Sequence, residues 1–219
     1  LFEKKLCYEV EEWDQKLSNK TRSEIEEMCY SVIDTSEFKN IYENLIFTLN
    51  KFYGFKYIFQ RRPSVRIQKP NDRAALFHID SLTGHGNDLI NFWVPLKRTV
   101  RENSLWLVNE ELSKKFLSKI RKEKWTVGEL DTNAKPHANP KIMKYGQILV
   151  FSNKTLHGCI DNDSDKIRVS FDFRALPINS SAGTKNKENM FYVPRKNNSL
   201  KNILTNANTV VYCNHKAKH

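Results

Sequence analysis

The first quarter of the chain has the apolar periodicity of amphipathic helices. Thr21 and Glu24 have the spacing of an N-terminal capping box, and apolar residues then recur at helical intervals. A second segment with the same period covers residues 38–52. Because each helix presents one apolar stripe, we expect both to pack against a flat surface such as a sheet. The pattern predicts a helical leader over residues 1–54.

Short apolar runs replace the helical period after residue 54, with turn-forming clusters such as residues 84–87 between them. The predicted strands cover residues 57–59, 64–69, 75–80, 89–94, 105–108, 148–151 and 167–174. Many short strands behind a helical leader are typical of a β-sandwich or jelly roll. We therefore predict an α+β fold with a mainly β core, buttressed by the N-terminal helices.

Two segments depart from this rhythm. Residues 110–144 begin with a helical pattern, whereas residues 131–137 have the composition of a loop, so we interpret the insertion as a lid or binding loop. Residues 178–219 are rich in Asn, Lys and Ser, and this composition alone predicts a weakly ordered tail. We expect the tail to dock on the body or on a second subunit. We expect one domain over 1–219, with its core at 55–177 and a homodimer through the tail as one option.

The charge of the chain favours anionic partners. Its formal net charge is +11 and its sequence pI is about 9.4, which suits nucleic acid, phosphorylated metabolites or an acidic carrier protein. A lysine-rich solvated surface explains the same charge equally well. No apolar run reaches the ~18 residues of a membrane span, so we expect no membrane association. The cysteines form no CxxC pair, which indicates reduced thiols and a cytoplasmic location; they are Cys7, Cys29, Cys159 and Cys213.

Three residues have the identity and spacing of metal ligands. His78 and Asp80 are two positions apart, which on an extended strand directs both side chains to the same face. His157 lies where the chain leaves the predicted strand 148–151. Two imidazoles and one carboxylate bind one face of an octahedral ion and leave three positions open, which suits Fe(II).

The predicted strand after His157 alternates strictly between polar and apolar residues. Arg168, Ser170, Asp172 and Arg174 share one face, and the apolar residues between them share the other. An arginine and a hydroxyl on one face are suited to a fork-like grip on a carboxylate.

Together, His78-x-Asp80, His157 and Arg168-x-Ser170 resemble the H-x-D…H…R-x-S pattern of the Fe(II)/2-oxoglutarate-dependent dioxygenases. Within that superfamily the chain is most similar to the phytanoyl-CoA hydroxylase-like and small bacterial biosynthetic hydroxylase branches. Residues 91–96 and 102–106 support the match, which covers about 64–174, half of the chain. The resemblance implies a double-stranded β-helix (jelly roll) with iron at its open mouth.

The resemblance also implies residue roles. Arg168 would pair with the distal carboxylate of 2-oxoglutarate, and Ser170 would add a hydrogen bond. Candidates to steady the other end of the co-substrate, or else the substrate, are Arg66, Gln68 and Asn91. These three residues are equally consistent with polar side chains that only contact solvent. Candidate substrate contacts are Arg174, Trp93, Trp106, His85 and His137. The alternative interpretation is that the tryptophans belong to the core and that the histidines lie in a solvated turn and a loop.

The implied reaction consumes O₂ and 2-oxoglutarate, releases succinate and CO₂, and hydroxylates an unactivated carbon of a polar or anionic small molecule, free or carrier-tethered. Because Asp80 stands where halogenases have Ala or Gly, the resemblance favours hydroxylation over halogenation.

Three alternatives remain at this stage. Arg168 and Arg174 also resemble the R-x5-R pair of AlkB-type nucleic-acid demethylases, but the tyrosine-containing segment of that family is not visible. A non-redox cupin-like metal- or sugar-binding module would not require Arg168 and Ser170. A basic nucleic-acid-binding module would interleave aromatics with a basic stripe, whereas the lysines here are dispersed. We therefore do not expect nucleic acid as the partner.

Overall fold

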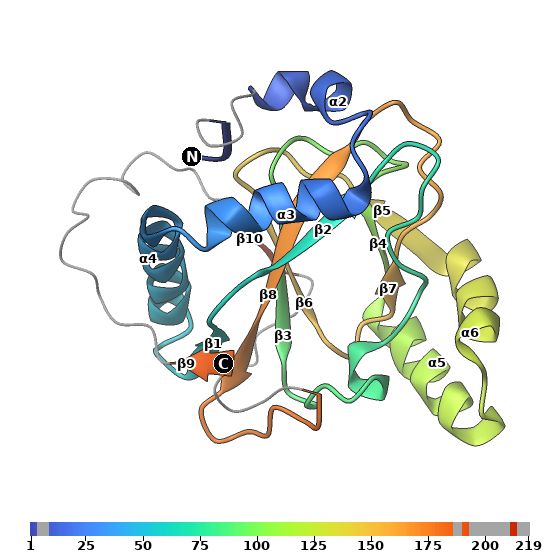
Figure 1. Ribbon diagram of the computed structural model, residues 1–219. Coiled ribbons are helices and arrows are strands. Elements are labelled where there is room, and N and C mark those ends of the chain that lie inside the picture. Colours follow the sequence, from blue (N-terminus) through green and yellow to red (C-terminus); the bar gives the residue numbers. More distant parts are fainter. Residues whose placement is uncertain (4–8, 186–189, 193–210, 214–219) are drawn as a thin grey trace.

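Two β-sheets form the centre of the computed structural model, which describes residues 1–3, 9–185, 190–192 and 211–213 (Figure 1). The larger sheet has seven strands in the order β10-β6-β3-β8-β1-β9, with β2 also paired to β8. The smaller sheet has three strands in the order β5-β4-β7. All pairings are antiparallel except that of β10 with β6. The architecture is therefore mixed, with helices on mainly antiparallel sheets.

The bounds of the strands follow the predicted runs closely in most cases. In the larger sheet they are β1 (Tyr57–Gln60), β2 (Ser64–Gln68), β3 (Ile90–Pro95), β6 (Ile148–Ser152), β8 (Arg168–Pro177), β9 (Phe191–Tyr192) and β10 (Val211–Cys213). In the smaller sheet they are β4 (Leu105–Val108), β5 (Ala138–Lys141) and β7 (His157–Gly158). Thus two short pieces of the predicted tail, β9 and β10, extend the larger sheet; a homodimer through the tail stays a prediction.

Two N-terminal helices cover the outer face of the larger sheet. Helix α3 (Arg22–Ile33) begins with the predicted capping box, and α4 (Ser36–Phe52) begins with a hydrogen bond to the Thr35 side chain. Their apolar stripes pack on side chains of β8 such as Phe173. Full burial of a residue such as Ile46 contributes about 1.5–3 kcal/mol, so these stripes hold the helices to the sheet. Both predicted helices are confirmed. Shorter helices, η1 (Val10–Glu12) and α2 (Trp13–Lys16), precede them.

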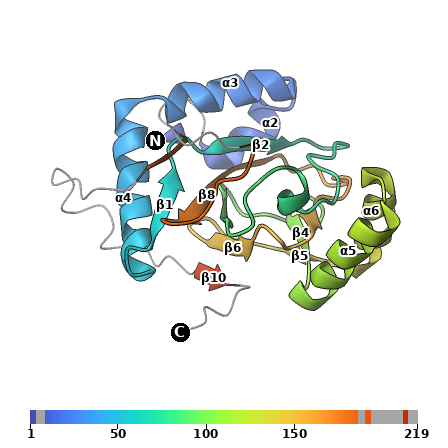
Figure 2. The same ribbon diagram turned by 90° about the horizontal axis from the view of Figure 1, so that it is seen from below.

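Helices α5 (Glu110–Glu123) and α6 (Val127–Ala134) cover the outer face of the smaller sheet, on the opposite side of the molecule from α3 and α4 (Figure 2). The expectation of a loop over residues 131–137 was wrong, because these residues form the end of α6 and a short 3-10 helix, η3 (Lys135–His137). Thr126 and Glu129 form a capping box, and Leu130 and Ala134 are buried one turn apart. The helix therefore has both a start signal and a packed face.

The predicted strand over residues 75–80 is also wrong. Only an isolated bridge joins His78 to His157, and the chain then turns into a 3-10 helix, η2 (Asp80–Leu82). The backbone N–H of Phe77 donates to the carboxylate of Asp131 rather than to a neighbouring strand. Because the Phe77 N–H binds a side chain instead of a neighbouring strand, the bridge at His78 does not extend into a regular ladder.

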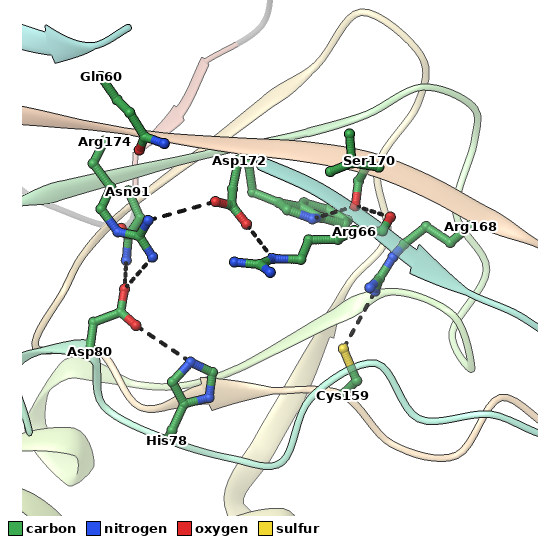
Figure 3. A network of polar contacts seen from close by, with 12 residues as sticks. Gln60, Arg66, His78, Asp80, Asn91, Cys159, Arg168, Ser170, Asp172 and Arg174 are labelled. Atoms are coloured by element: carbon green, nitrogen blue, oxygen red, sulfur yellow. Dashed lines mark hydrogen bonds and ion pairs between the residues drawn. The ribbon is translucent and has the colours of Figure 1, made fainter. Parts of the chain in front are cut away.

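The inner faces of the two sheets enclose an apolar cluster and a polar network. The apolar cluster includes Trp93, Leu107 and Phe151. The polar network lies on β8, β2 and β3 beside it (Figure 3). Within the described ranges, no helix combines the length and apolar composition that crossing a membrane requires.

Candidate metal and co-substrate site

Three potential metal ligands meet at the bridge between two distant segments. His78, Asp80 and His157 offer ligand atoms that all lie within 4.8 Å of one another. The bridge is a pair of backbone hydrogen bonds, from His78 N to His157 O at 2.9 Å and from His157 N to His78 O at 3.0 Å. The extended backbone of Ile79 then brings Asp80 to the same side as His78. The three side chains are therefore placed by backbone contacts, before any ion binds.

Both imidazoles are oriented by main-chain carbonyl groups. His78 Nδ1 lies 2.8 Å from Leu76 O, and His157 Nδ1 lies 2.8 Å from Thr155 O. A carbonyl oxygen can only accept, so each Nδ1 carries the proton and donates it. The lone pair is then on Nε2, which is the tautomer that metal-binding histidines adopt with such partners.

Asp80 is almost fully buried, with 3% of its surface exposed. Its Oδ1 lies 3.4 Å from His78 Nε2, whereas its Oδ2 accepts hydrogen bonds from Asn91 Nδ2 at 2.9 Å and Arg174 Nη2 at 3.4 Å. Burial raises the pKa of Asp80, but a hydrogen bond from His78 in its protonated form and the positive charges of His157 and Arg174 outweigh burial, so the pKa lies well below its usual range. The carboxylate is thus ionised, with Oδ1 directed toward His78 and Oδ2 held from behind.

The two imidazoles titrate differently. Burial, together with the charge of His78, lowers the pKa of His157 to about 4, so this ring is neutral near pH 7. Burial also lowers the pKa of His78, but hydrogen bonding to Asp80 and its negative charge outweigh burial and raise it above the ordinary value. A proton and a metal ion would therefore compete for His78 Nε2.

This donor set fits a divalent transition metal. Two neutral imidazole nitrogens and one carboxylate oxygen occupy one face of an ion, and the orienting carbonyls and amide support each ligand. Three protein ligands on one face would leave further coordination positions of the ion open.

A buried guanidinium lies on the inner face of β8 and has no acidic partner in the part of the chain that the structure describes. Arg168 is 2% exposed, and its Nη1 donates to Asn103 O at 3.0 Å and lies 3.5 Å from Cys159 Sγ. Its Nε is buried with no hydrogen-bond partner, and among the described residues no carboxylate forms an ion pair with it. Because an unpaired buried charge costs several kcal/mol, this environment fits the carboxylate of a ligand.

Ser170 and Trp93 surround the same guanidinium. The Trp93 indole N–H donates to Ser170 Oγ at 3.1 Å, and the Arg168 guanidinium carbon lies 5.6 Å from the centre of the indole ring. Strand register explains the contact, because Arg168 and Ser170 point the same way on β8 and Trp93 lies on the neighbouring strand β3. The structure thus brings Arg168 and Ser170 together, as the alternation predicted, and adds Trp93 to them.

The candidates on β2 and β3 have separate surroundings. Gln68 is buried and donates to the main-chain oxygens of Asp72 and Ile160, so it ties loops together. Asn91 supports Asp80. The half-exposed Arg66 pairs with Asp172 at 2.8 Å.

The remaining candidates lie in three different places. Trp106 packs in the cluster beneath α5 and α6, and His137 is exposed on η3, where its ring lies 5.9 Å from that of Phe116. His85 is 7% exposed, so the expectation of a solvated turn was wrong for this residue. The neighbouring Gly86 N–H donates to Ala182 O, and this loop contact encloses His85. Burial, followed by the charge of Arg174, lowers the pKa of His85 to about 4.

No protein-family model matches the chain. The chain is 30% identical over 137 residues to the streptomycin biosynthesis protein StrG of Streptomyces griseus. The alignment covers 62% of this chain and 54% of StrG, so the chain spans about half the length of this curated relative.

Similar solved structures overlap with parts of the chain. The non-haem monooxygenase ThoJ is 12% identical, with a TM-score of 0.49 over 83% of this chain and 71% of its own. The α-ketoglutarate-dependent carbocyclase SnoK from nogalamycin biosynthesis is 12% identical, with a TM-score of 0.42 over 59% of this chain and 53% of SnoK. AviO1 from Streptomyces viridochromogenes Tue57 is 15% identical, with a TM-score of 0.40 over 56% of this chain and 53% of AviO1.

Proposed function

We propose that this chain is a non-haem Fe(II)/2-oxoglutarate-dependent oxygenase that hydroxylates a carbon of a polar small molecule, and that its two sheets form a double-stranded β-helix. The observation that carries the proposal is the pairing of two features between the sheets. One is the cluster of His78, Asp80 and His157; the other is the buried Arg168, which has no acidic partner among the described residues. A metal site alone would not need such an arginine, whereas a co-substrate with a distal carboxylate would.

In this proposal His78, Asp80 and His157 would hold the iron. With 2-oxoglutarate and O₂ it would supply an oxidant strong enough for an unactivated C–H bond, with succinate and CO₂ as by-products. Asn91 and Arg174 keep Asp80 ionised and oriented by occupying its Oδ2.

Arg168, Ser170 and Trp93 would bind the far carboxylate of 2-oxoglutarate. Arg168 Nε, which has no partner among the described residues, would donate a charge-assisted hydrogen bond. The Ser170 hydroxyl group, which donates to Arg66 O over a long 3.4 Å, would turn to donate to the carboxylate instead. The neighbouring apolar side chains, Leu107 and Phe151 among them, would exclude water and strengthen the ionic contact. Because StrG is named for streptomycin biosynthesis, we infer that the substrate is a small biosynthetic intermediate.

Spectroscopy under anaerobic conditions tests the proposal. Fe(II) and 2-oxoglutarate added to the chain should produce the weak visible charge-transfer band of the chelate, and O₂ should then release succinate slowly without substrate. His157→Ala should abolish the band and Arg168→Ala should weaken co-substrate binding, whereas the exposed His137→Ala and Arg62→Ala serve as matched controls. A folded, iron-loaded protein that gives neither band nor succinate would refute the proposal and favour a non-redox cupin-like module.

A further inference from the structure

An ionic network continues from Asp80 across the inner face of the larger sheet (Figure 3). Arg174 Nη2 lies 3.4 Å from Asp80 Oδ2, and Arg174 Nη1 lies 3.8 Å from Asp172 Oδ1. Asp172 Oδ2 in turn pairs with Arg66 Nε at 2.8 Å. The network therefore alternates in sign and ends at the guanidinium of Arg66.

Arg66 is the accessible end of this network. Half of its side chain is exposed, at 50%, compared with 17% for Asp172 and 13% for Arg174. Among the described residues it donates only through Nε, so both terminal nitrogens keep their N–H groups for another partner. Figure 3 shows its guanidinium directed into the space between Asp172 and His78. A fixed guanidinium with its terminal donors available is suited to bidentate binding of an oxyanion.

The net charge of the site also favours an anionic ligand. Within the described ranges the site carries three arginines and two aspartates, which leave one positive charge when the histidines are neutral; these residues are Arg66, Arg168, Arg174, Asp80 and Asp172. Under the proposed function, the two charges of Fe(II) and the two of 2-oxoglutarate cancel. The loaded site therefore remains positive, as does the chain as a whole at +11. An anionic substrate would neutralise the site, whereas a cationic one would be repelled.

We propose that Arg66 is a substrate-binding residue, and that the substrate carries an oxyanion, either a carboxylate or a phosphate ester. Asp172 is then a positioning residue, because its ion pair fixes the direction of the Arg66 guanidinium. This inference rests on the proposed function and adds the chemical class of the substrate.

A binding experiment without turnover tests the proposal, with inorganic phosphate as the probe. The chain is loaded with Mn(II) and saturating 2-oxoglutarate, and phosphate is titrated while its phosphorus NMR relaxation is recorded, since the paramagnetic ion accelerates relaxation of phosphate held nearby. We expect saturable binding that is at least about tenfold weaker in Arg66→Gln and partly restored in Arg66→Lys. The matched control is Arg62→Gln, because Arg62 is 51% exposed and pairs with Asp34; it should behave as the unmodified chain.

Calorimetric titration of 2-oxoglutarate into the same metal-loaded variants distinguishes a failure of the Arg66 inference from a failure of the oxygenase proposal. We expect Arg66→Gln to change the affinity for 2-oxoglutarate by less than about twofold, because Arg168 binds that molecule in the proposed function. A large loss would assign Arg66 to the co-substrate and overturn the inference. Phosphate binding that is absent, or equal in Arg66→Gln and the unmodified chain, would overturn it as well while leaving the oxygenase proposal intact. Absence of 2-oxoglutarate binding to the unmodified chain would instead refute the oxygenase proposal itself.

Discussion

Replacing Arg168 by methionine should stabilise the ligand-free protein, although most substitutions of buried residues destabilise. Arg168 is 2% exposed and has no carboxylate partner among the described residues. Methionine keeps much of the arginine volume beside Trp93 and Cys159 without a charge that needs hydration. Replacing a buried ion pair by well-packed apolar residues is often neutral or stabilises a protein by about 1–4 kcal/mol, and the unpaired charge of Arg168 lacks even the attraction of a partner.

Two further effects set the expected size of the change. The substitution removes the 3.0 Å hydrogen bond from Arg168 to Asn103 O, which costs about 1–2 kcal/mol. The net gain in the free energy of unfolding is then about 1 kcal/mol. Saturating 2-oxoglutarate at a hundred times its Kd should stabilise the unmodified, metal-loaded chain by about 2.7 kcal/mol. The Arg168→Met variant should gain no stability from 2-oxoglutarate, because it lacks the guanidinium that binds it. The order of stability should therefore reverse when the co-substrate is added.

Urea unfolding followed by tryptophan fluorescence, with and without metal and 2-oxoglutarate, measures both quantities. Arg174→Met is the matched comparison, because Arg174 shares the strand and face of Arg168 but pairs with Asp80 and Asp172. Its removal leaves the buried carboxylate of Asp80 and the partly buried one of Asp172 without that partner and should cost about 3 kcal/mol. If Arg168→Met destabilises the ligand-free protein as much as Arg174→Met does, the protein itself compensates the charge of Arg168 and the reasoning fails.

Two further predictions concern the metal ligands. A Cβ on Gly158 would lie 2.7 Å from Phe77 Cα, so Gly158→Ala should displace the bridge at His157. We expect this variant to bind Zn(II) at least about tenfold more weakly. Gly128→Ala is the control and should bind Zn(II) as the unmodified chain does, because a Cβ there would have no atom within 4 Å. Zn(II) affinity should also fall as pH falls through the raised pKa of His78, by about tenfold per pH unit, because one proton competes with the metal. Since the pKa of His157 is about 4, a two-proton dependence between pH 5 and about 7 would contradict this assignment.

Local patterns were sufficient to predict the site residues that share a strand. The polar alternation of β8 places Arg168 and Ser170 on one face, because successive side chains of a strand point in opposite directions. The two-residue spacing of His78 and Asp80 similarly brings them together, although the backbone there forms only an isolated bridge. Such predictions depend on the direction of side chains over a few residues, which the sequence determines directly.

Contacts between distant segments could not be predicted in the same way. Asn91 supports Asp80, and the carbonyl oxygen of Asn103 binds Arg168, because the packing of the fold brings together segments that lie 11 and 65 residues apart. The burial of His85 depends likewise on a loop that contacts its neighbour from residues 181–183. The helix over residues 127–134 is different, because the capping box at Thr126 was present in the sequence and could have revealed it.

The candidate ligands and the ionic groups come from different parts of the fold, and this separation has an energetic consequence. His157 lies on the smaller sheet and bridges to His78, whereas Arg168 and Arg174 lie on the larger one. The contact from Arg174 to Asp80 crosses between these parts. A metal ion bound to the first part and a co-substrate that spans to the second would therefore join the two sheets. Binding free energy would then add to the stability of the packed sheets, and the ligand-free protein would be the form in which they separate most readily.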